Sequence, residues 1–150
     1  MARLREASGA ADLDSVRELF TEYALLVDEP CCFAGLEQEL AELAERYPVL
    51  LLAEAEAAAI GCVGVRSVDR RTAEMKRLYV RAAHRGRGIG RRLAEAAIAV
   101  ARSRGFERMV LDSLPKMHEA LALYRSLDFR EIAPYLPEPT PGARCFELRL

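Results

Sequence analysis

The sequence has no tryptophan and only 7% aromatic residues, and it holds few side chains that commonly bind transition metals. These are Cys31, Cys32, Cys62, Cys145, His84 and His118. No two cysteines form a Cys-x-x-Cys pair, and both histidines lie far from the cysteines in sequence. Because zinc sites require closely spaced ligand pairs, the sequence predicts no metal site. Adjacent cysteines such as Cys31 and Cys32 rarely bridge each other, so we expect four reduced thiols without a chemical role.

Long apolar runs are missing as well. No stretch is long enough to cross a bilayer, and the first six residues lack the apolar core of a signal peptide. We therefore expect a cytoplasmic protein without a membrane partner.

The chain also lacks an excess of charge of one sign. Its 22 basic and 23 acidic residues give a net charge of -1, which disfavours generic nucleic-acid binding. What is present is a hydrophobic content of 51% over 150 residues. This content excludes disorder and suffices to bury the core of one domain, residues 1–150.

Apolar periodicity and turn residues predict an alternation of helices and strands. In chain order, the predicted elements are a strand at 3–7, a helix with Asp12 as its N-cap that ends before the break at 28–30, a helix at 36–47, strands at 49–53, 59–65 and 73–80, a helix after the glycine-rich turn 86–90, a strand at 108–112, a helix at 118–127, and closing strands that begin at Phe129 and Cys145. Short polar linkers make the three middle strands an antiparallel meander. The order indicates an α+β fold.

Residues 85–90, Arg-Gly-Arg-Gly-Ile-Gly, follow an apolar strand and open an amphipathic helix. The first amides of a helix lack internal acceptors and the helix dipole is positive there, so this segment predicts an anion site. Glycines let the backbone approach a ligand, and Arg85, Arg87 and Arg91 supply planar cations that suit phosphate. A pyrophosphate is the natural ligand, although a tight turn with exposed arginines is the competing interpretation.

Two common nucleotide motifs do not fit this segment. Gly86, Gly88 and Gly90 are spaced Gly-x-Gly-x-Gly, whereas the dinucleotide fingerprint requires Gly-x-Gly-x-x-Gly, and only Asp112 could serve as its acidic partner. The Gly-Lys-Ser/Thr of a Walker loop is absent. A third pattern, Arg/Gln-x-x-Gly-x-Gly/Ala after a strand, is satisfied by Arg85, Gly88 and Gly90.

The segment from Leu78 to Gly90, together with the helix that follows, resembles the acetyl-CoA motif of the GNAT superfamily of N-acetyltransferases. A second match, Ala-x-x-Leu-Tyr-x-x-x-x-Phe at residues 120–129, resembles the final helix of that family. The resemblance covers nearly the whole chain. It implies a mixed, mostly antiparallel central sheet that splays between strands 73–80 and 108–112 and is flanked by about four helices.

The resemblance implies that acetyl-CoA is the cosubstrate, without a metal. Pantetheine would lie between the splayed strands and the pyrophosphate would bind the glycine-rich turn. The cofactor-binding residues implied are Leu78, Tyr79, Val80, Arg85, Gly86, Arg87, Gly88, Ile89, Gly90, Arg91 and Met117. The acetyl group would pass directly from sulfur to a primary amine of a small molecule or peptide, and a homodimer is common in the family. The competing hypotheses are a non-catalytic acyl-CoA-binding module and a nucleotide-phosphate binder.

Two residues are candidates for proton transfer. Tyr124 stands where family members place a tyrosine, and a phenol with a pKa of about 10 is a reasonable donor to the departing thiolate. Glu74 matches a glutamate that acts as base in some members, because an amine with a pKa of about 10.4 needs a proton acceptor. By strand alternation, Glu74, Lys76, Leu78 and Val80 should share one face, so Lys76 could simply pair with Glu74. Tyr124 could likewise be an ordinary packing residue.

Two positions depart from the family pattern. Many relatives carry asparagine where Met117 stands, and a thioether cannot reproduce that polar contact. Asp128 replaces the glycine that usually ends the final helix, so we predict a positive φ at Asp128.

The acceptor side is less determined. Acidic and aromatic residues around the break between the first two helices would suit a cationic amine, namely Asp28, Glu29, Phe33, Glu37 and Glu39. Tyr135 and Arg144 flank a proline-rich loop, and Arg144 would instead favour an acceptor with a carboxylate. A solvated acidic helix face is the alternative for the first group.

Overall fold

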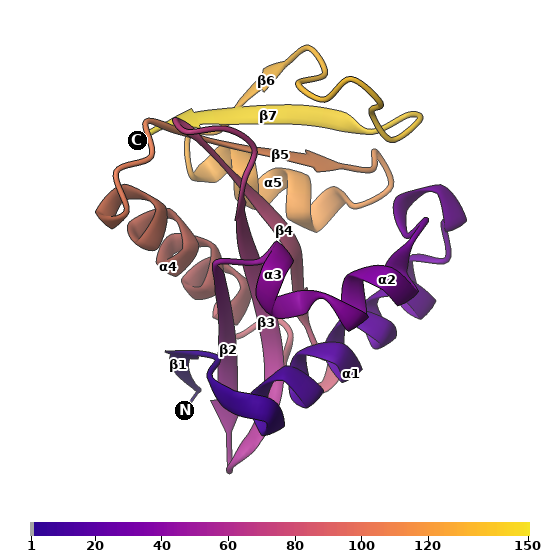
Figure 1. Ribbon diagram of the computed structural model, residues 1–150, viewed down its shortest axis with the longest axis vertical. Helices are drawn as coiled ribbons and strands as arrows, with labels where there is room; N and C mark the ends of the chain where they lie inside the picture. Colours follow the sequence, from indigo (N-terminus) through magenta and orange to yellow (C-terminus); the bar gives the residue numbers. More distant parts are fainter. Residues whose placement is uncertain (1) are drawn as a thin grey trace.

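The computed structural model describes residues 2–150, which form one seven-stranded sheet with helices on both faces (Figure 1). Its elements are β1 (Arg3–Glu6), α1 (Gly9–Val27), the 3₁₀ turn η1 (Pro30–Cys32), α2 (Leu36–Ala41), α3 (Leu43–Arg46), β2 (Val49–Ala55), β3 (Ala58–Ser67), β4 (Thr72–Val80), the 3₁₀ turn η2 (Ala82–His84), α4 (Ile89–Ser103), β5 (Arg108–Ser113), α5 (His118–Ser126), β6 (Arg130–Ile132) and β7 (Arg144–Arg149). The predicted α+β class is confirmed.

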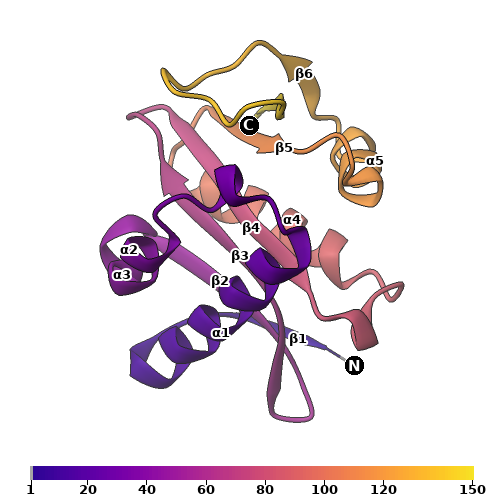
Figure 2. The ribbon, with the colours of Figure 1, turned by 90° about the vertical axis from the view of Figure 1, so that its right-hand side faces the viewer.

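The sheet has the strand order β1-β2-β3-β4-β5-β7-β6 and is antiparallel except between β4 and β5. The parallel pairing of β4 with β5 spans only three residues on each strand, ending at Glu74 opposite Val110. Beyond that point the two strands separate. Figures 1 and 2 show the result: β5, β7 and β6 lie across the end of the upright β2–β4 meander. The predicted splay is confirmed.

Each face of the meander buries its own apolar cluster because alternate residues of a strand point to opposite sides. On β2, Leu51 and Ala53 join α4 and α5, whereas Leu50 and Leu52 join α1 and α3. A site between the splayed strands is therefore covered by helices from both layers. No helix within residues 2–150 is both long and apolar enough to cross a bilayer.

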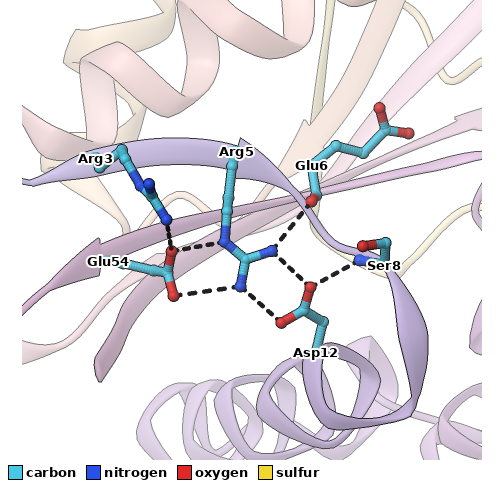
Figure 3. A network of polar contacts seen from close by, with 6 residues as sticks. All are labelled: Arg3, Arg5, Glu6, Ser8, Asp12 and Glu54. Carbon is cyan, nitrogen blue, oxygen red and sulfur yellow. Dashed lines mark hydrogen bonds and ion pairs between the residues drawn. The ribbon is translucent and has the colours of Figure 1, made fainter. Parts of the chain in front are cut away.

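The first helix begins earlier than predicted, with Ser8 as its N-cap and Gly9 as its first residue. Asp12 is not the N-cap, because its carboxylate lies inside the first turn and accepts a hydrogen bond from the Ser8 amide at 2.8 Å. The same carboxylate binds Arg5, which also binds Glu54 of β2 (Figure 3). These contacts fasten the start of α1 to the sheet.

The predicted helix at 36–47 is split at Glu42, whose φ of -120° and ψ of 30° lie outside the helical region. The described residues therefore contain five α-helices rather than about four. After the break, Leu43 and Tyr47 are buried in the core, and the Tyr47 ring lies so close to Gly64 that an added Cβ would stand 2.7 Å from it.

Two helices end in the same hydrogen-bond pattern. After α4, the Phe106 amide bonds to the Ala101 carbonyl across Gly105, whose φ is 86°. After α5, the Phe129 amide bonds to the Tyr124 carbonyl across Asp128, whose φ is 72°. Both are Schellman motifs. The prediction of a positive φ at Asp128 is confirmed.

Candidate active site

The glycine-rich turn presents free backbone amides to open space. Gly88, with a φ of 76°, is the N-cap of α4, and Gly86 has a φ of 79°. Within residues 2–150, none of the amides of residues 86–91 has a backbone acceptor. A Cβ added at Gly86 or Gly88 would meet no atom within 4 Å. The turn is therefore an unobstructed cradle for an anion.

A groove of about 830 Å³ runs from this turn along β4, within the roughly 300–1,000 Å³ typical of ligand sites. It is lined by Tyr23, Leu26, Val27, Leu78, Tyr79, Val80, His84, Arg85, Gly86, Gly88, Ile89, Gly90, Lys116, Met117, His118, Glu119, Ala120 and Leu123. The structure thus brings together nine of the eleven cofactor-binding residues that the resemblance implies. Arg87 and Arg91 do not line the groove.

The three arginines near the turn differ in whether their side chains are positioned to bind a phosphate in the groove. Arg85 lines the groove, and its Nε donates to the Val80 carbonyl at 2.8 Å. Arg87 is exposed and has no side-chain partner within residues 2–150. Arg91 donates to the Ser126 hydroxyl. Arg85 is thus the arginine that the structure holds against the groove, next to the free amides.

A β-bulge changes the direction of side chains in the middle of β4. Lys76 pairs with Gly64 and Tyr79 pairs with Cys62, so two residues of β4 oppose one residue of β3. At the bulge Arg77 has a φ of 60°, and its guanidinium binds the Glu39 carboxylate at 2.7 Å, with both side chains 8% exposed.

The bulge overturns the expected face for part of the strand. Because paired residues share a face, Glu74, Lys76 and Tyr79 lie on one face of the sheet, the face on which Tyr79 packs with α1. Leu78 and Val80 pack instead with the cluster around α4. The prediction that Glu74, Lys76, Leu78 and Val80 share one face is wrong, since strict alternation fails at an extra residue.

A smaller inner cavity of about 60 Å³ lies where β4 and β5 separate. It is lined by Tyr23, Val27, Cys32, Phe33, Met75, Lys76, Arg77, Leu78, Asp112, Ser113, Leu114, Met117, Tyr124, Thr140 and Ala143. Four of these residues, Tyr23, Val27, Leu78 and Met117, also line the groove. The two hollows therefore adjoin.

Tyr124 of α5 lines the inner cavity and is 7% exposed. Its ring meets Phe129 edge to face with centroids 5.9 Å apart, which is the apolar contact of the Schellman motif. The hydroxyl has no hydrogen-bond partner within residues 2–150, and burial raises its pKa above the ordinary value of about 10. The geometry leaves a protonated phenol beside the cavity.

Glu74 is fully buried and does not line either hollow. Its carboxylate binds the Arg66 guanidinium and accepts a hydrogen bond from the Tyr135 hydroxyl. Lys76, proposed as the possible partner of Glu74, makes no ion pair with it and lines the inner cavity instead.

Sequence reasoning did not assign Tyr23 or Asp112 to this site. The Tyr23 hydroxyl donates to the Met117 sulfur at 3.7 Å, and burial raises the pKa of Tyr23 to about 12. Asp112 lies near the carboxyl end of β5, where ligands commonly bind in sheets with parallel strands. The position of Asp112 at the end of a predicted strand could therefore have identified it from the sequence. Tyr23 fits the apolar stripe of the first helix, so no sequence feature marked it as a site residue.

The expected acidic acceptor cluster is dispersed. Glu39 is buried against Arg77 and accepts a hydrogen bond from the Tyr47 hydroxyl at 2.8 Å. Glu29 binds Lys116 at 2.9 Å. Of the five residues in that group, Phe33 alone lines the inner cavity. Arg144, the alternative carboxylate ligand, is bound to Glu131.

The four cysteines are free thiols. Within the described part of the chain, no three His, Cys, Asp or Glu side chains are grouped so that they could hold a metal ion.

Comparison with known proteins agrees with this geometry. The model of the acetyltransferase (GNAT) family matches residues 13–129. An uncharacterized N-acetyltransferase of Schizosaccharomyces pombe is 33% identical over 145 residues, covering 93% of this chain and 89% of the relative. An acetyltransferase structure from Streptococcus agalactiae superposes with a TM-score of 0.85 at 19% identity, over 99% of this chain and 98% of the other. A GNAT family acetyltransferase from Elizabethkingia anophelis, solved with acetyl-CoA bound, has a TM-score of 0.61 at 25% identity, over 73% of this chain and 82% of the other.

Proposed function

The chain belongs to the GNAT family of acetyltransferases and is an acyl-CoA-dependent N-acyltransferase, and from this premise we propose that it transfers an acetyl group from acetyl-CoA to a primary amine of a small molecule or peptide. The observation that carries the proposal is the junction of the groove with the inner cavity. An anion cradle lies at one end of the groove and a buried phenol, Tyr124, lies in the cavity at the other. A donor that is phosphorylated at one end and reactive at the other matches this arrangement.

The residues of the groove fit a CoA-sized ligand. The amides of residues 86–91 and the start of α4 would hold the pyrophosphate, with Arg85 beside it. The exposed edge of β4 from Leu78 to Val80 would bind the pantetheine arm, since β4 has no partner strand on its β5 side there. The related structure from Elizabethkingia anophelis, which holds acetyl-CoA, supports the identity of the donor.

Bound acetyl-CoA supplies an activated acyl group, and in the transfer a nitrogen–carbon bond forms while the carbon–sulfur bond breaks. Tyr124 gives its proton to the departing sulfur, because a phenol is protonated at neutral pH and this one lines the cavity in which the thiolate would form. Tyr23 and Met117 line both hollows and form part of the wall between them. Holding amine and thioester in contact supplies much of the rate in direct transfer.

The amine must lose a proton before or during attack. Glu74 remains our proposed base, and because neither it nor its hydrogen-bond partner Tyr135 lines a hollow, it would receive the proton through a relay that includes Tyr135 and further groups. A Glu74→Gln variant tests this role by its pH–rate profile. If the Glu74→Gln profile coincides with that of the parent, the proton acceptor lies elsewhere, and Asp112 in the cavity is the second carboxylate to substitute.

The proposed function is tested by release of free CoA thiol from acetyl-CoA with a panel of amines. We expect thiol release that depends on both acetyl-CoA and an amine, together with an N-acetylated product detected by mass spectrometry. Acetyl-CoA that binds without thiol release with any amine would indicate the non-catalytic module instead. Competition by CoA but not by ATP would exclude a general nucleotide-phosphate binder.

A further inference from the structure

The inner cavity contains one cation and one anion that do not touch each other or any other charge. Lys76 on β4 and Asp112 on β5 both line it. Within residues 2–150, neither side chain makes an ion pair within 4.0 Å or a side-chain hydrogen bond. Lys76 and Asp112 lie on β4 and β5 just beyond Glu74 and Val110, where the pairing of the two strands ends. The sheet therefore leaves a gap between them.

The neighbouring charges are already neutralised. Arg77 lines the cavity but binds Glu39 of α2. Arg66 binds Glu74, and neither of these two residues lines the cavity. Lys76 and Asp112 are thus the cation and the anion that remain available to a ligand in this cavity.

Half-buried charges without partners are unfavourable, since neither water nor a counter-charge fully replaces the lost solvation. Burial lowers the pKa of Lys76 and raises the pKa of Asp112, and opposite charges partly counter both shifts, chiefly Glu74 for Lys76 and Lys76 for Asp112. A ligand that carries both signs would satisfy both residues at once.

Resting on the proposed function, we propose that the acceptor is an amine that also carries a carboxylate, as an α-amino acid does. Lys76 binds the carboxylate and Asp112 faces the amino group. A volume of about 60 Å³ has room for about four or five water-sized groups, which corresponds to the head group of an amino acid. The acceptor side chain would extend past Phe33 and Thr140, which line the same cavity.

The test compares acceptors that differ only in the carboxylate. Each common L-amino acid is assayed beside its α-carboxamide and its decarboxylated amine, with kcat and KM measured by thiol release from acetyl-CoA. We expect the best amino acid to exceed its carboxamide in kcat/KM by about tenfold or more, the size of one charge-assisted hydrogen bond.

The variant Lys76→Met removes the cation and keeps most of the length of the unbranched side chain. It should raise KM for the amino acid by about tenfold and leave the carboxamide and the affinity for acetyl-CoA unchanged. A matched Asp112→Asn variant should weaken all amines alike, because each retains its amino group.

Equal or better turnover of the carboxamide or the decarboxylated amine would overturn the proposal while leaving the N-acetyltransferase function in place. An equal effect of Lys76→Met on the amino acid and its carboxamide would overturn it as well. If no amine of any kind released thiol, the proposed function itself would fail, so the two failures are distinguishable.

Discussion

The groove and the inner cavity adjoin, yet they are built in opposite ways. The groove is formed mainly by two short segments, 78–90 and 116–123, and its anion donors are backbone amides. The inner cavity takes side chains from α1, η1, β4, β5, α5 and the loop before β7. In Figure 2 the colours of these elements run from the indigo of α1 through β4 and β5 to the yellow of the chain before β7.

This difference has a physical consequence for recognition. Local backbone angles fix the position of the amides at a helix start, so these amides can bind any ligand whose phosphate fits there. Side chains such as Lys76 and Asp112 depend on where two strands separate, so they can vary without disturbing the groove. In the proposed function, the groove therefore selects the donor and the inner cavity selects the acceptor. Substitutions in the groove, in the cavity and at two sites outside both hollows test this division of roles.

The largest effect is expected from a charge placed at the start of α4. Gly90→Asp should weaken acetyl-CoA binding by about 1,000-fold, since a carboxylate about 4 Å from phosphate costs roughly 4 kcal/mol near a protein surface. Gly90→Ala is the matched control, because a Cβ there meets only Val80 Cγ2 at an ordinary 3.9 Å. Calorimetric titration with acetyl-CoA measures both, and equal affinities for the two variants would refute the anion cradle.

The second-largest effect is expected on kcat, from a substitution in the inner cavity. Tyr124→Phe should lower kcat by about 100-fold and leave the affinity for acetyl-CoA unchanged, because the proton donor is lost while the groove is intact. The fold should persist, since the hydroxyl has no hydrogen-bond partner within residues 2–150 and the ring contact with Phe129 remains. An unchanged kcat would remove Tyr124 from the mechanism, and weaker acetyl-CoA binding would show that groove and cavity are not separable.

A smaller effect concerns the helix end that carries Tyr124. Asp128→Gly should raise the free energy of unfolding by about 0.5 kcal/mol, because glycine adopts the observed positive φ without steric cost. Gly105→Asp places the same residue in the matching motif of α4 and should lose a similar amount. Urea unfolding of both variants measures this. Changes of the same sign in the two would contradict the common cause.

The smallest effect lies far from both hollows, in the ion network of Arg5, Asp12 and Glu54 (Figure 3). Hydrogen bonds from Arg5 lower the pKa of Asp12 to about 2, below the value of about 3.9 for the unfolded chain. A lowered folded-state pKa means that the stabilisation is present above about pH 4 and disappears as the pH falls toward 2.

The stability difference between the parent and Asp12→Asn should accordingly be constant near neutral pH and shrink between about pH 4 and 2. Chemical unfolding at a series of pH values measures the difference. A difference that grows with acidity would reverse the assigned sign. Acetyl-CoA affinity of Asp12→Asn at neutral pH should match that of the parent, because this network touches neither hollow.

Local sequence signals predicted one part of the molecule well. The strand before the glycine-rich turn, the free amides of that turn and the end of α5 all appear as expected, because each depends on a few consecutive residues. The same signals failed at β4, where alternation placed Leu78 with Glu74. They also failed at Glu42, where a continuous apolar stripe concealed a break between two helices.

Short motifs were enough to predict the free amides before α4, the positive φ at Asp128 and the family, since backbone angles and motif spacing are local properties. The bulge at Arg77, the contacts of Glu74 with Arg66 and Tyr135, and the shared cavity of Lys76 and Asp112 became visible in the three-dimensional structure alone. The reason is that each of these features joins residues that lie far apart in the sequence, so no short segment specifies them.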